Sequence, residues 1–269
     1  MMENGQDDFG FVENDHKRRG VYLLPGAFTV GNLLCGFYAV LAALQGGTAQ
    51  LDYAARAIGF AILFDAFDGF IARMTHTNTD FGKQFDSLAD MVSFGMAPAV
   101  LGYAWGVQVM MQSDGGEARH VHQLAWLVCL AFVICCAWRL ARFNVHGMAP
   151  GGLRYFVGMP TPAAAGVIAA TVHAAGEPLS DWRWSLVWLA LILAVAALMV
   201  SSIRYPSFKD LPWARKQHSL WYIAAALLVG SIIKYSEVML ILIAGGYLIS
   251  GLGVHVVRMV RHRLVSRTA

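Results

Sequence analysis

The sequence predicts an all-α, polytopic membrane protein, and three observations support this fold class. Hydrophobic residues make up 57% of the 269-residue chain and charged residues only 14%, whereas soluble domains carry about 25% charged residues. The mean hydropathy is high, at +0.53. The apolar residues also fall in runs long enough to cross a bilayer, which takes roughly 20 residues in a helix. A chain with so little polar surface is expected to have lipid as its solvent.

Eight apolar segments are predicted to be transmembrane helices. Some contain Gly or Pro, which helices in lipid tolerate because neighbouring groups satisfy the freed backbone. The segments cover residues 27–46, 53–74, 86–110, 122–143, 159–176, 184–203, 219–234 and 237–258. The fifth and the seventh are the shortest of the set.

The basic residues predict how these helices are oriented. If the N-terminus is cytoplasmic, all but four of the 20 Lys and Arg residues lie on the cytoplasmic side. The four exceptions are Arg56, Arg119, Arg183 and Lys234. The positive-inside rule therefore favours a multi-pass protein of the cytoplasmic membrane with both termini in the cytoplasm. The chain divides into a cytoplasmic N-terminal tail, one membrane domain and a basic cytoplasmic C-terminal tail, at residues 1–20, 21–258 and 259–269.

Four carboxylates lie where the second and third predicted helices meet the cytoplasmic interface. The two stretches read DAFDGFIAR at 65–73 and GKQFDSLAD at 82–90. Asp65 and Asp68 are three residues apart, and Asp86 and Asp90 are four apart. At these spacings each pair lies on one face of its helix.

Bound cations are the expected partners of these acids. Four unpaired carboxylates near lipid would be costly, and the single guanidinium of Arg73 cannot balance them. Oxygen ligands without His or Cys favour Mg²⁺ or Mn²⁺. Four carboxylates from two helices could hold two such ions roughly 4 Å apart, as in two-metal phosphoryl chemistry. The alternative is that each acid only pairs with Arg or Lys at a helix end.

Small residues beside the acids predict room for a ligand. Gly69 and Ala72 share or border the face of Asp65 and Asp68, and they would open a groove where a ligand approaches the backbone. Arg73 then offers a fork-shaped cation to phosphate oxygens.

These two stretches resemble the signature of the CDP-alcohol phosphotransferase family, which is D-x-x-D-G-x-x-A-R, eight residues, and G-x-x-x-D-x-x-x-D. Every fixed position is filled, by Asp65, Asp68, Gly69, Ala72, Arg73, Gly82, Asp86 and Asp90. The resemblance implies a membrane helix bundle, commonly a homodimer, with a cytoplasm-facing site. It implies two metal ions on the four Asp residues, with Asp90 as the general base. It also implies a CDP group seated against Asp68, Gly69, Ala72 and Arg73.

Further segments resemble the phosphatidylserine synthase branch of that family in bacteria and archaea. They are LPGAFTVGNLLCG at 24–36, SFGMAPA at 93–99, RLARFN at 139–144, GMPTPAA at 158–164 and IRYPSFK at 203–209. The first departs from the branch at Gly26, where Asn is usual. This resemblance implies that the hydroxyl of L-serine displaces CMP from CDP-diacylglycerol in the membrane, and no nucleic-acid partner is expected.

Arginines near the cytoplasmic helix ends are candidates for binding the serine carboxylate. Arg139, Arg142 and Arg204 could each form a bidentate clamp. They could equally anchor helix ends to lipid headgroups.

Three polar residues are candidates for binding the CDP-lipid. Thr29 and Asn32 lie on the first predicted helix near the same membrane face, and Thr79 lies between the two acidic stretches. For each, a helix–helix hydrogen bond or a loop cap is an equally open reading.

Two other functions compete with this prediction. Relatives with the same core signature use glycerol-3-phosphate, inositol phosphate or choline as acceptors. A divalent-cation transporter is a rival from a different class, because intramembrane acids often line ion pathways. The acids lie near one interface, however, whereas transporter sites usually lie near the midplane. A membrane scaffold without activity is the third reading.

Overall fold

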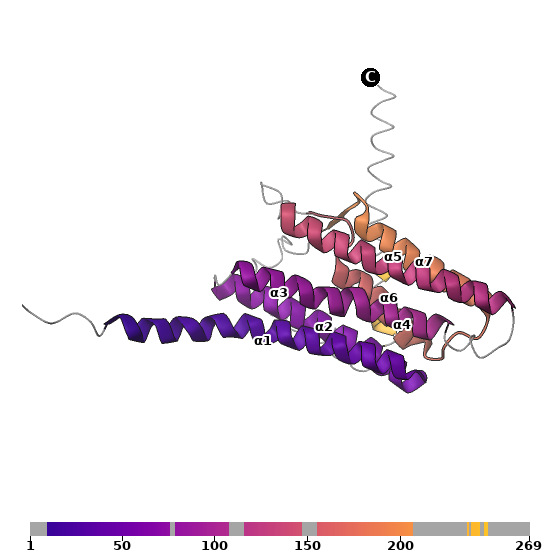
Figure 1. The fold of residues 1–269 in the computed structure, drawn as a ribbon, viewed down its shortest axis with the longest axis horizontal. Helices are drawn as coiled ribbons and strands as arrows, with labels where there is room; N and C mark the ends of the chain where they lie inside the picture. Colours follow the sequence, from indigo (N-terminus) through magenta and orange to yellow (C-terminus); the bar gives the residue numbers. More distant parts are fainter. Residues whose placement is uncertain are drawn as a thin grey trace, which may run out of the picture.

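The computed structural model describes residues 10–75, 79–107, 116–146, 155–206, 236, 238–242 and 245–246. Helices account for most of this part of the chain (Figure 1). They are α1 (Gly10–Gln45), α2 (Thr48–Thr75), α3 (Asp80–Asp90), the π-helix η1 (Met91–Met96), α4 (Ala97–Val107), α5 (Gly116–His146), α6 (Thr161–Ala175) and α7 (Trp182–Val200).

Local sequence explains where several of these helices begin and end. Gly46 and Gly47, between α1 and α2, have φ angles of 69° and 81°, a left-handed conformation that glycine adopts without steric cost. Thr79 caps α3, where its side chain accepts a hydrogen bond from the backbone N–H of Gly82 at 3.0 Å. Asp181 caps α7 in the same way, by accepting from the N–H of Arg183 at 3.0 Å. Such caps satisfy backbone donors that a helix leaves open.

The helices pack in a bundle, with α5 and α7 side by side on one face, α1 and α2 on the other, and α6 packed against α2 and α4 (Figure 1). Large apolar side chains fill the interior, including the fully buried Phe94, Phe132 and Ile192. In lipid, such side chains stabilise the bundle through close van der Waals packing between helices, because the lipid tails are as apolar as the side chains themselves.

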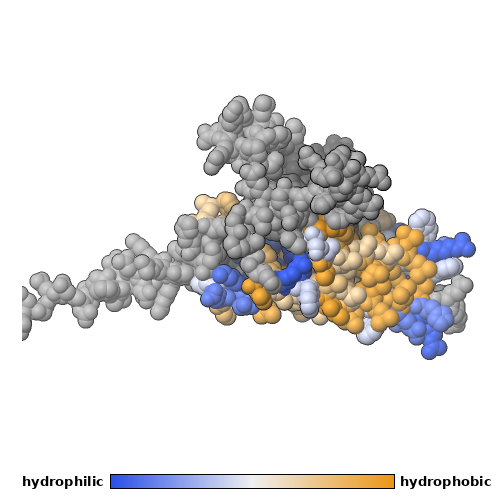
Figure 2. All heavy atoms as spheres, turned by 90° about the horizontal axis from the view of Figure 1, so that it is seen from above, coloured by the Kyte–Doolittle hydropathy of each residue, from blue (hydrophilic) through white to orange (hydrophobic). Residues whose placement is uncertain are grey.

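The outer surface is apolar as well. Leu34, Phe60 and Trp138 are among many large hydrophobic side chains that remain exposed. Figure 2 shows a broad hydrophobic belt on one face of the molecule, with hydrophilic residues gathered at the two ends of the belt. Helices at Gly26–Gln45, Arg119–Val145 and Trp182–Val200 are long and apolar enough to cross a membrane, and Thr161–Ala175 is a shorter apolar helix. The chain is therefore a polytopic membrane protein built of helices.

The first six predicted transmembrane segments each have a helical counterpart. The third, predicted as one helix over 86–110, is two helices joined by η1, and it begins earlier, at Asp80, because of the Thr79 cap. Helix α1 begins at Gly10, inside the stretch predicted as an N-terminal tail. The seventh segment lies outside the described residues, and the eighth is described only in part, as helix at 238–242 and 245–246.

A short antiparallel ribbon is the one part of the described chain that an all-helical prediction did not contain. Strand β1 (Tyr155–Val157) pairs with β2 (Arg204–Pro206), with Phe156 opposite Tyr205. Gly158 follows β1 with a φ of 82°, and its N–H donates to the carbonyl of Ile203 at 2.8 Å. A Cβ at this position would lie 2.4 Å from the carbonyl oxygen of Met199. The ribbon thus ties the start of α6 to the end of α7.

At the other end of the bundle, the buried His173 of α6 links two parts of the chain. Its Nδ1 hydrogen-bonds the carboxylate of Asp52 on α2, and its Nε2 lies 2.8 Å from Oγ of Ser236. Asp52 also forms a salt bridge of 2.8 Å with Arg56. The second bond of His173 thus joins Ser236, which comes just before the last predicted segment, to the core.

We expect His173→Leu to lower the unfolding midpoint of the detergent-solubilised protein. The change leaves Asp52 and Ser236 without this partner, and such a loss costs about 1–3 kcal/mol. Thermal unfolding followed by tryptophan fluorescence measures the effect. His120→Leu is the matched control, because His120 is exposed; equal midpoints for the two variants would show that the His173 bonds do not stabilise the fold.

Candidate active site

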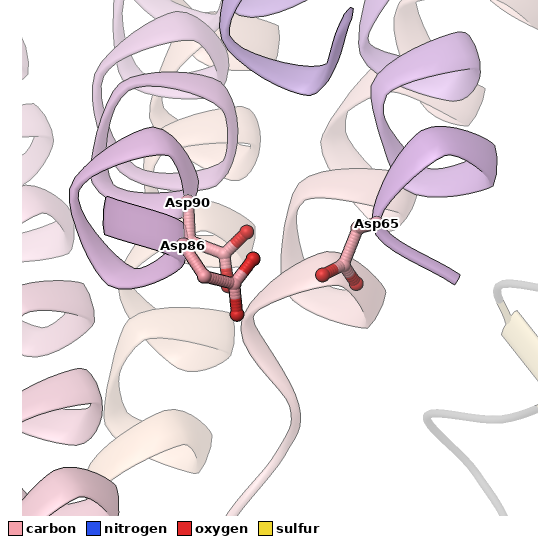
Figure 3. Close-up of side chains that lie close together, drawn as sticks. All are labelled: Asp65, Asp86 and Asp90. Carbon is pink, nitrogen blue, oxygen red and sulfur yellow. The ribbon is translucent and has the colours of Figure 1, made fainter. Parts of the chain in front are cut away.

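Three of the four predicted acids meet between α2 and α3. Asp65 comes from α2, and Asp86 and Asp90 come from successive turns of α3. Each offers a carboxylate oxygen within 4.8 Å of the others. Figure 3 shows the side chain of Asp65 pointing toward those of Asp86 and Asp90 across the space between the two helices. We call Asp65, Asp86 and Asp90 the carboxylate cluster.

Asp68, the fourth acid, lies beside this cluster and is buried. It accepts a hydrogen bond from the hydroxyl of Thr29 on α1. It is also close enough to Asp86 for the two carboxylates to repel each other. All four acids therefore share one electronegative region at the same end of the bundle.

Asn32 of α1 holds Asp90. Its Nδ2 donates to Oδ1 of Asp90 at 3.0 Å, and the asparagine is completely buried. Thr29 and Asn32 are three residues apart, so they share a face of α1 and contact one acid each. The structure therefore gives both residues helix–helix hydrogen bonds, one of the two readings that the sequence left open. Their contact with a CDP-lipid stays a prediction.

The two candidate arginines of α5, Arg139 and Arg142, have different surroundings. Arg139 is only 9% exposed, and its Nη1 donates to Oγ1 of Thr161 at 3.1 Å. Its guanidinium also attracts the carboxylate of Asp90. Arg142 instead donates from Nη1 to the backbone carbonyl of Val200 at 3.4 Å, at the end of α7. Arg139 thus lies inside the bundle, which argues against a role as a lipid-headgroup anchor.

The remaining candidates are described less fully. Gly69 is half-buried on α2, and Thr79 serves as the cap of α3, as noted above. The side chains of Ala72, Arg73 and Arg204 lie outside the described part of the structure. The seat predicted for the CDP group therefore stays a prediction.

Two site contacts were missed by the sequence reasoning. Oγ of Ser93 donates to the backbone carbonyl of Asn32 at 2.9 Å, and Nδ2 of Asn144 donates to Oγ of Ser87 at 2.9 Å. Ser93 and Asn144 both lie in segments already singled out, SFGMAPA and RLARFN. The motifs that contain Ser93 and Asn144 could therefore be recognised in the sequence. Their hydrogen-bond partners could not, because these contacts depend on how distant helices pack.

The donor set fits a divalent cation. All the donors are carboxylate oxygens, which hard cations such as Mg²⁺ and Mn²⁺ prefer. Oδ1 of Asp86 is buried and has no hydrogen-bond partner within the described part of the chain. Burying such an oxygen is costly unless a positive charge or a donor satisfies it. The carboxylate cluster could therefore hold a metal ion.

The helix bundle and this cluster define a class: an integral membrane protein with an acidic, metal-type site between its helices. The family model described as CDP-alcohol phosphatidyltransferase matches residues 22–205, and the chain belongs to this family. The family predicted from the spacing of Asp, Gly, Ala and Arg is thereby confirmed.

Curated proteins of similar sequence come from bacteria and archaea. One, named CDP-diacylglycerol–serine O-phosphatidyltransferase, from Helicobacter pylori (strain ATCC 700392 / 26695), is 32% identical over 197 residues, which cover 73% of this chain and 77% of that protein. The archaetidylserine synthase of Methanothermobacter thermautotrophicus is 34% identical over 195 residues, covering 72% and 73%. A protein of Bacillus subtilis with the first name is 29% identical over 188 residues, covering 69% and 91%.

Proposed function

We propose that this chain is a phosphatidylserine synthase, which transfers the phosphatidyl group of CDP-diacylglycerol to the hydroxyl of L-serine and releases CMP. The carboxylate cluster is the observation that carries the proposal. Its three acids come from the two stretches of the family signature, and they meet in space. The names of the relatives support serine as the acceptor.

The reaction forms one bond to the β-phosphorus and breaks another. The serine oxygen attacks, the bond from the β-phosphorus to the bridging oxygen breaks, and CMP leaves with that electron pair. Asp90 accepts the proton of the serine hydroxyl, which is a weak nucleophile while protonated. The bond from Asn32 fixes one oxygen of Asp90 and leaves the other able to receive the proton.

We propose that Asp65, Asp68, Asp86 and Asp90 hold two ions of Mg²⁺ or Mn²⁺. When bound, these cations neutralise the charge that develops on the departing CMP. Asp68, Gly69, Ala72 and Arg73 would seat the CDP group, with Thr29, Asn32 and Thr79 at its edge. The acyl chains can stay in the bilayer, because the site lies at one end of the helices.

We further propose eight transmembrane helices, with both termini and the site in the cytoplasm, and a homodimer in the cytoplasmic membrane. The site end of the bundle carries Lys83, Arg139 and Arg142, which agrees with the positive-inside rule. A cysteine introduced at the exposed Ser202, in a background lacking the four native cysteines, should react with impermeant thiol reagents only in inside-out vesicles.

Arg139 is our candidate for binding the serine carboxylate, and Arg142 and Arg204 are the other two. We expect Arg139→Gln to raise the KM for serine about 10–100-fold, because charged hydrogen bonds are worth about 1.5–3 kcal/mol. The KM for CDP-diacylglycerol should change less than about threefold. Arg119→Gln is the matched control, since Arg119 lies exposed on the same helix, α5, and is not a candidate for binding serine. An equal rise of both KM values in Arg139→Gln would contradict the assignment.

An acceptor assay tests the function itself. Purified protein receives CDP-diacylglycerol and one radiolabelled acceptor at a time: L-serine, glycerol-3-phosphate, inositol phosphate or choline. Of the four acceptors, we expect only L-serine to give CMP release and labelled lipid. A metal chelator should abolish both products. If the phosphatidyl group is transferred to another acceptor instead, the chain is a member of the family with a different acceptor. Absence of CMP with every acceptor, together with cation flux in liposomes, would favour the transporter.

A further inference from the structure

Helix α1 and the π-helix η1 pack closely against each other next to the site. Their contact includes Gly36 and Ser93; Gly36 is buried, and Ser93 is fully buried. A Cβ added to Gly36 would lie 2.2 Å from Oγ of Ser93 and 2.6 Å from its Cα. No side chain fits in that space, so only glycine lets the two helices approach this closely.

This contact leads directly to the candidate base. Oγ of Ser93 donates to the backbone carbonyl of Asn32 at 2.9 Å, and Asn32 lies one helical turn before Gly36 on the same face of α1. Asn32 in turn donates to Asp90 at 3.0 Å, and Asp90 lies three residues before Ser93. Asn32, Gly36, Asp90 and Ser93 thus form a closed loop of contacts between two helices.

The π-helix helps to close this loop. It begins at Met91, directly after Asp90. A π-helix places an extra residue in the turn and so changes which side chains face a neighbouring helix, and such turns are frequent at functional sites. Here Ser93 of η1 faces α1, while Asp90 still faces the carboxylate cluster.

The amide of Asn32 has little else to orient it. Its Oδ1 is buried without a hydrogen-bond partner among the described residues. The direction of its Nδ2 donor therefore depends on the bond to Asp90 and on the position of the backbone, which Ser93 and Gly36 fix.

We infer that Gly36, Ser93 and Asn32 are positioning residues that aim the carboxylate of Asp90 at the reacting hydroxyl. This inference rests on the proposed function. Misplacing a reacting group by about 1 Å can cost about 100-fold in rate, whereas substrate affinity need not change. The inference therefore predicts an effect on kcat rather than on KM for the CDP-lipid.

The test compares Asn32→Leu, Ser93→Ala and Gly36→Ala with the wild-type enzyme in serine-dependent CMP release. We expect kcat to fall about 10–100-fold in Asn32→Leu and about tenfold in the other two. In Ser93→Ala and Gly36→Ala, which leave the predicted CDP-lipid residues in place, KM for CDP-diacylglycerol should stay within about threefold of wild type. Gly59→Ala is the matched control, because that helical glycine of α2 has open space around it; its kcat should stay at the wild-type value.

A double variant distinguishes positioning from general packing. Ser93→Ala combined with Asn32→Leu should be no slower than Asn32→Leu alone, because Ser93 acts on Asp90 through Asn32. Multiplied effects, an unchanged kcat in Ser93→Ala, or a raised KM for CDP-diacylglycerol at constant kcat would each overturn the inference. If Gly36→Ala does not fold, Ser93→Ala decides, since it removes only one oxygen atom. A wild-type enzyme that releases no CMP with serine would overturn the proposed function instead.

Discussion

Replacing Asp90 with Asn is expected to lower kcat at least about 1,000-fold, while binding of CDP-diacylglycerol changes less than about threefold. Asn keeps the size and one oxygen of Asp, so Asn32 retains an acceptor for its amide. It cannot take up the proton of the serine hydroxyl, and general base catalysis commonly supplies about 10²–10⁴ in rate. Single-turnover release of CMP at saturating metal measures the chemical step, and equilibrium binding of the CDP-lipid measures affinity.

Asp80→Asn is the matched control for this variant. Asp80 lies on the same helix, α3, but its side chain is fully exposed, and it contacts Lys83 at 3.4 Å. Removing the charge of Asp80 should leave kcat unchanged, because exposed ion pairs contribute little to stability and Asp80 is not part of the carboxylate cluster. Asp90→Asn with a kcat near that of Asp80→Asn would remove Asp90 from the role of base.

The positions of the helices could be predicted because crossing a bilayer imposes a length on the sequence. The apolar run at 122–143 lies within α5, and the run at 184–203 closely matches α7. The β1–β2 ribbon and the π-helix η1 could not be predicted in this way. The ribbon pairs residues about 50 positions apart, and η1 lies in a helical run that continues without a break from α3 into α4.

The acids of the site were predictable from local spacing, whereas their partners were not. A separation of three or four residues places two acids on one helix face whatever the rest of the chain does. The bonds from Thr29 to Asp68 and from Asn32 to Asp90 instead depend on how α1 packs. Burial also separates Arg139 from Arg142, which look alike in the sequence. The sequence thus identified the charged groups, and packing determined what each of them contacts.

Asp86→Asn is expected to have opposite effects on function and on the stability of the metal-free protein. Asp86 contributes an oxygen to the carboxylate cluster and experiences repulsion from Asp65 and Asp68. Removing its charge weakens the site proposed for Mg²⁺ or Mn²⁺, so we expect activity to fall at least about 100-fold, because metal sites and phosphoryl transfer depend on such carboxylates. The same change relieves like-charge repulsion, so the variant in chelator should unfold at a higher temperature than the wild type.

Adding metal should reverse this order of stability. A cation that binds only the folded wild type stabilises it by about 2.7 kcal/mol when present at 100 times its Kd, and the variant should gain much less. Unfolding midpoints with chelator and with Mg²⁺ or Mn²⁺, for the wild type, Asp86→Asn and the exposed control Asp80→Asn, test this without relying on turnover. If Asp86→Asn lowers the midpoint in chelator and responds to metal as the wild type does, then Asp86 stabilises the fold and does not bind the ion. The repulsion within the cluster would in that case be balanced inside the protein, and the case for a metal at this site would fail.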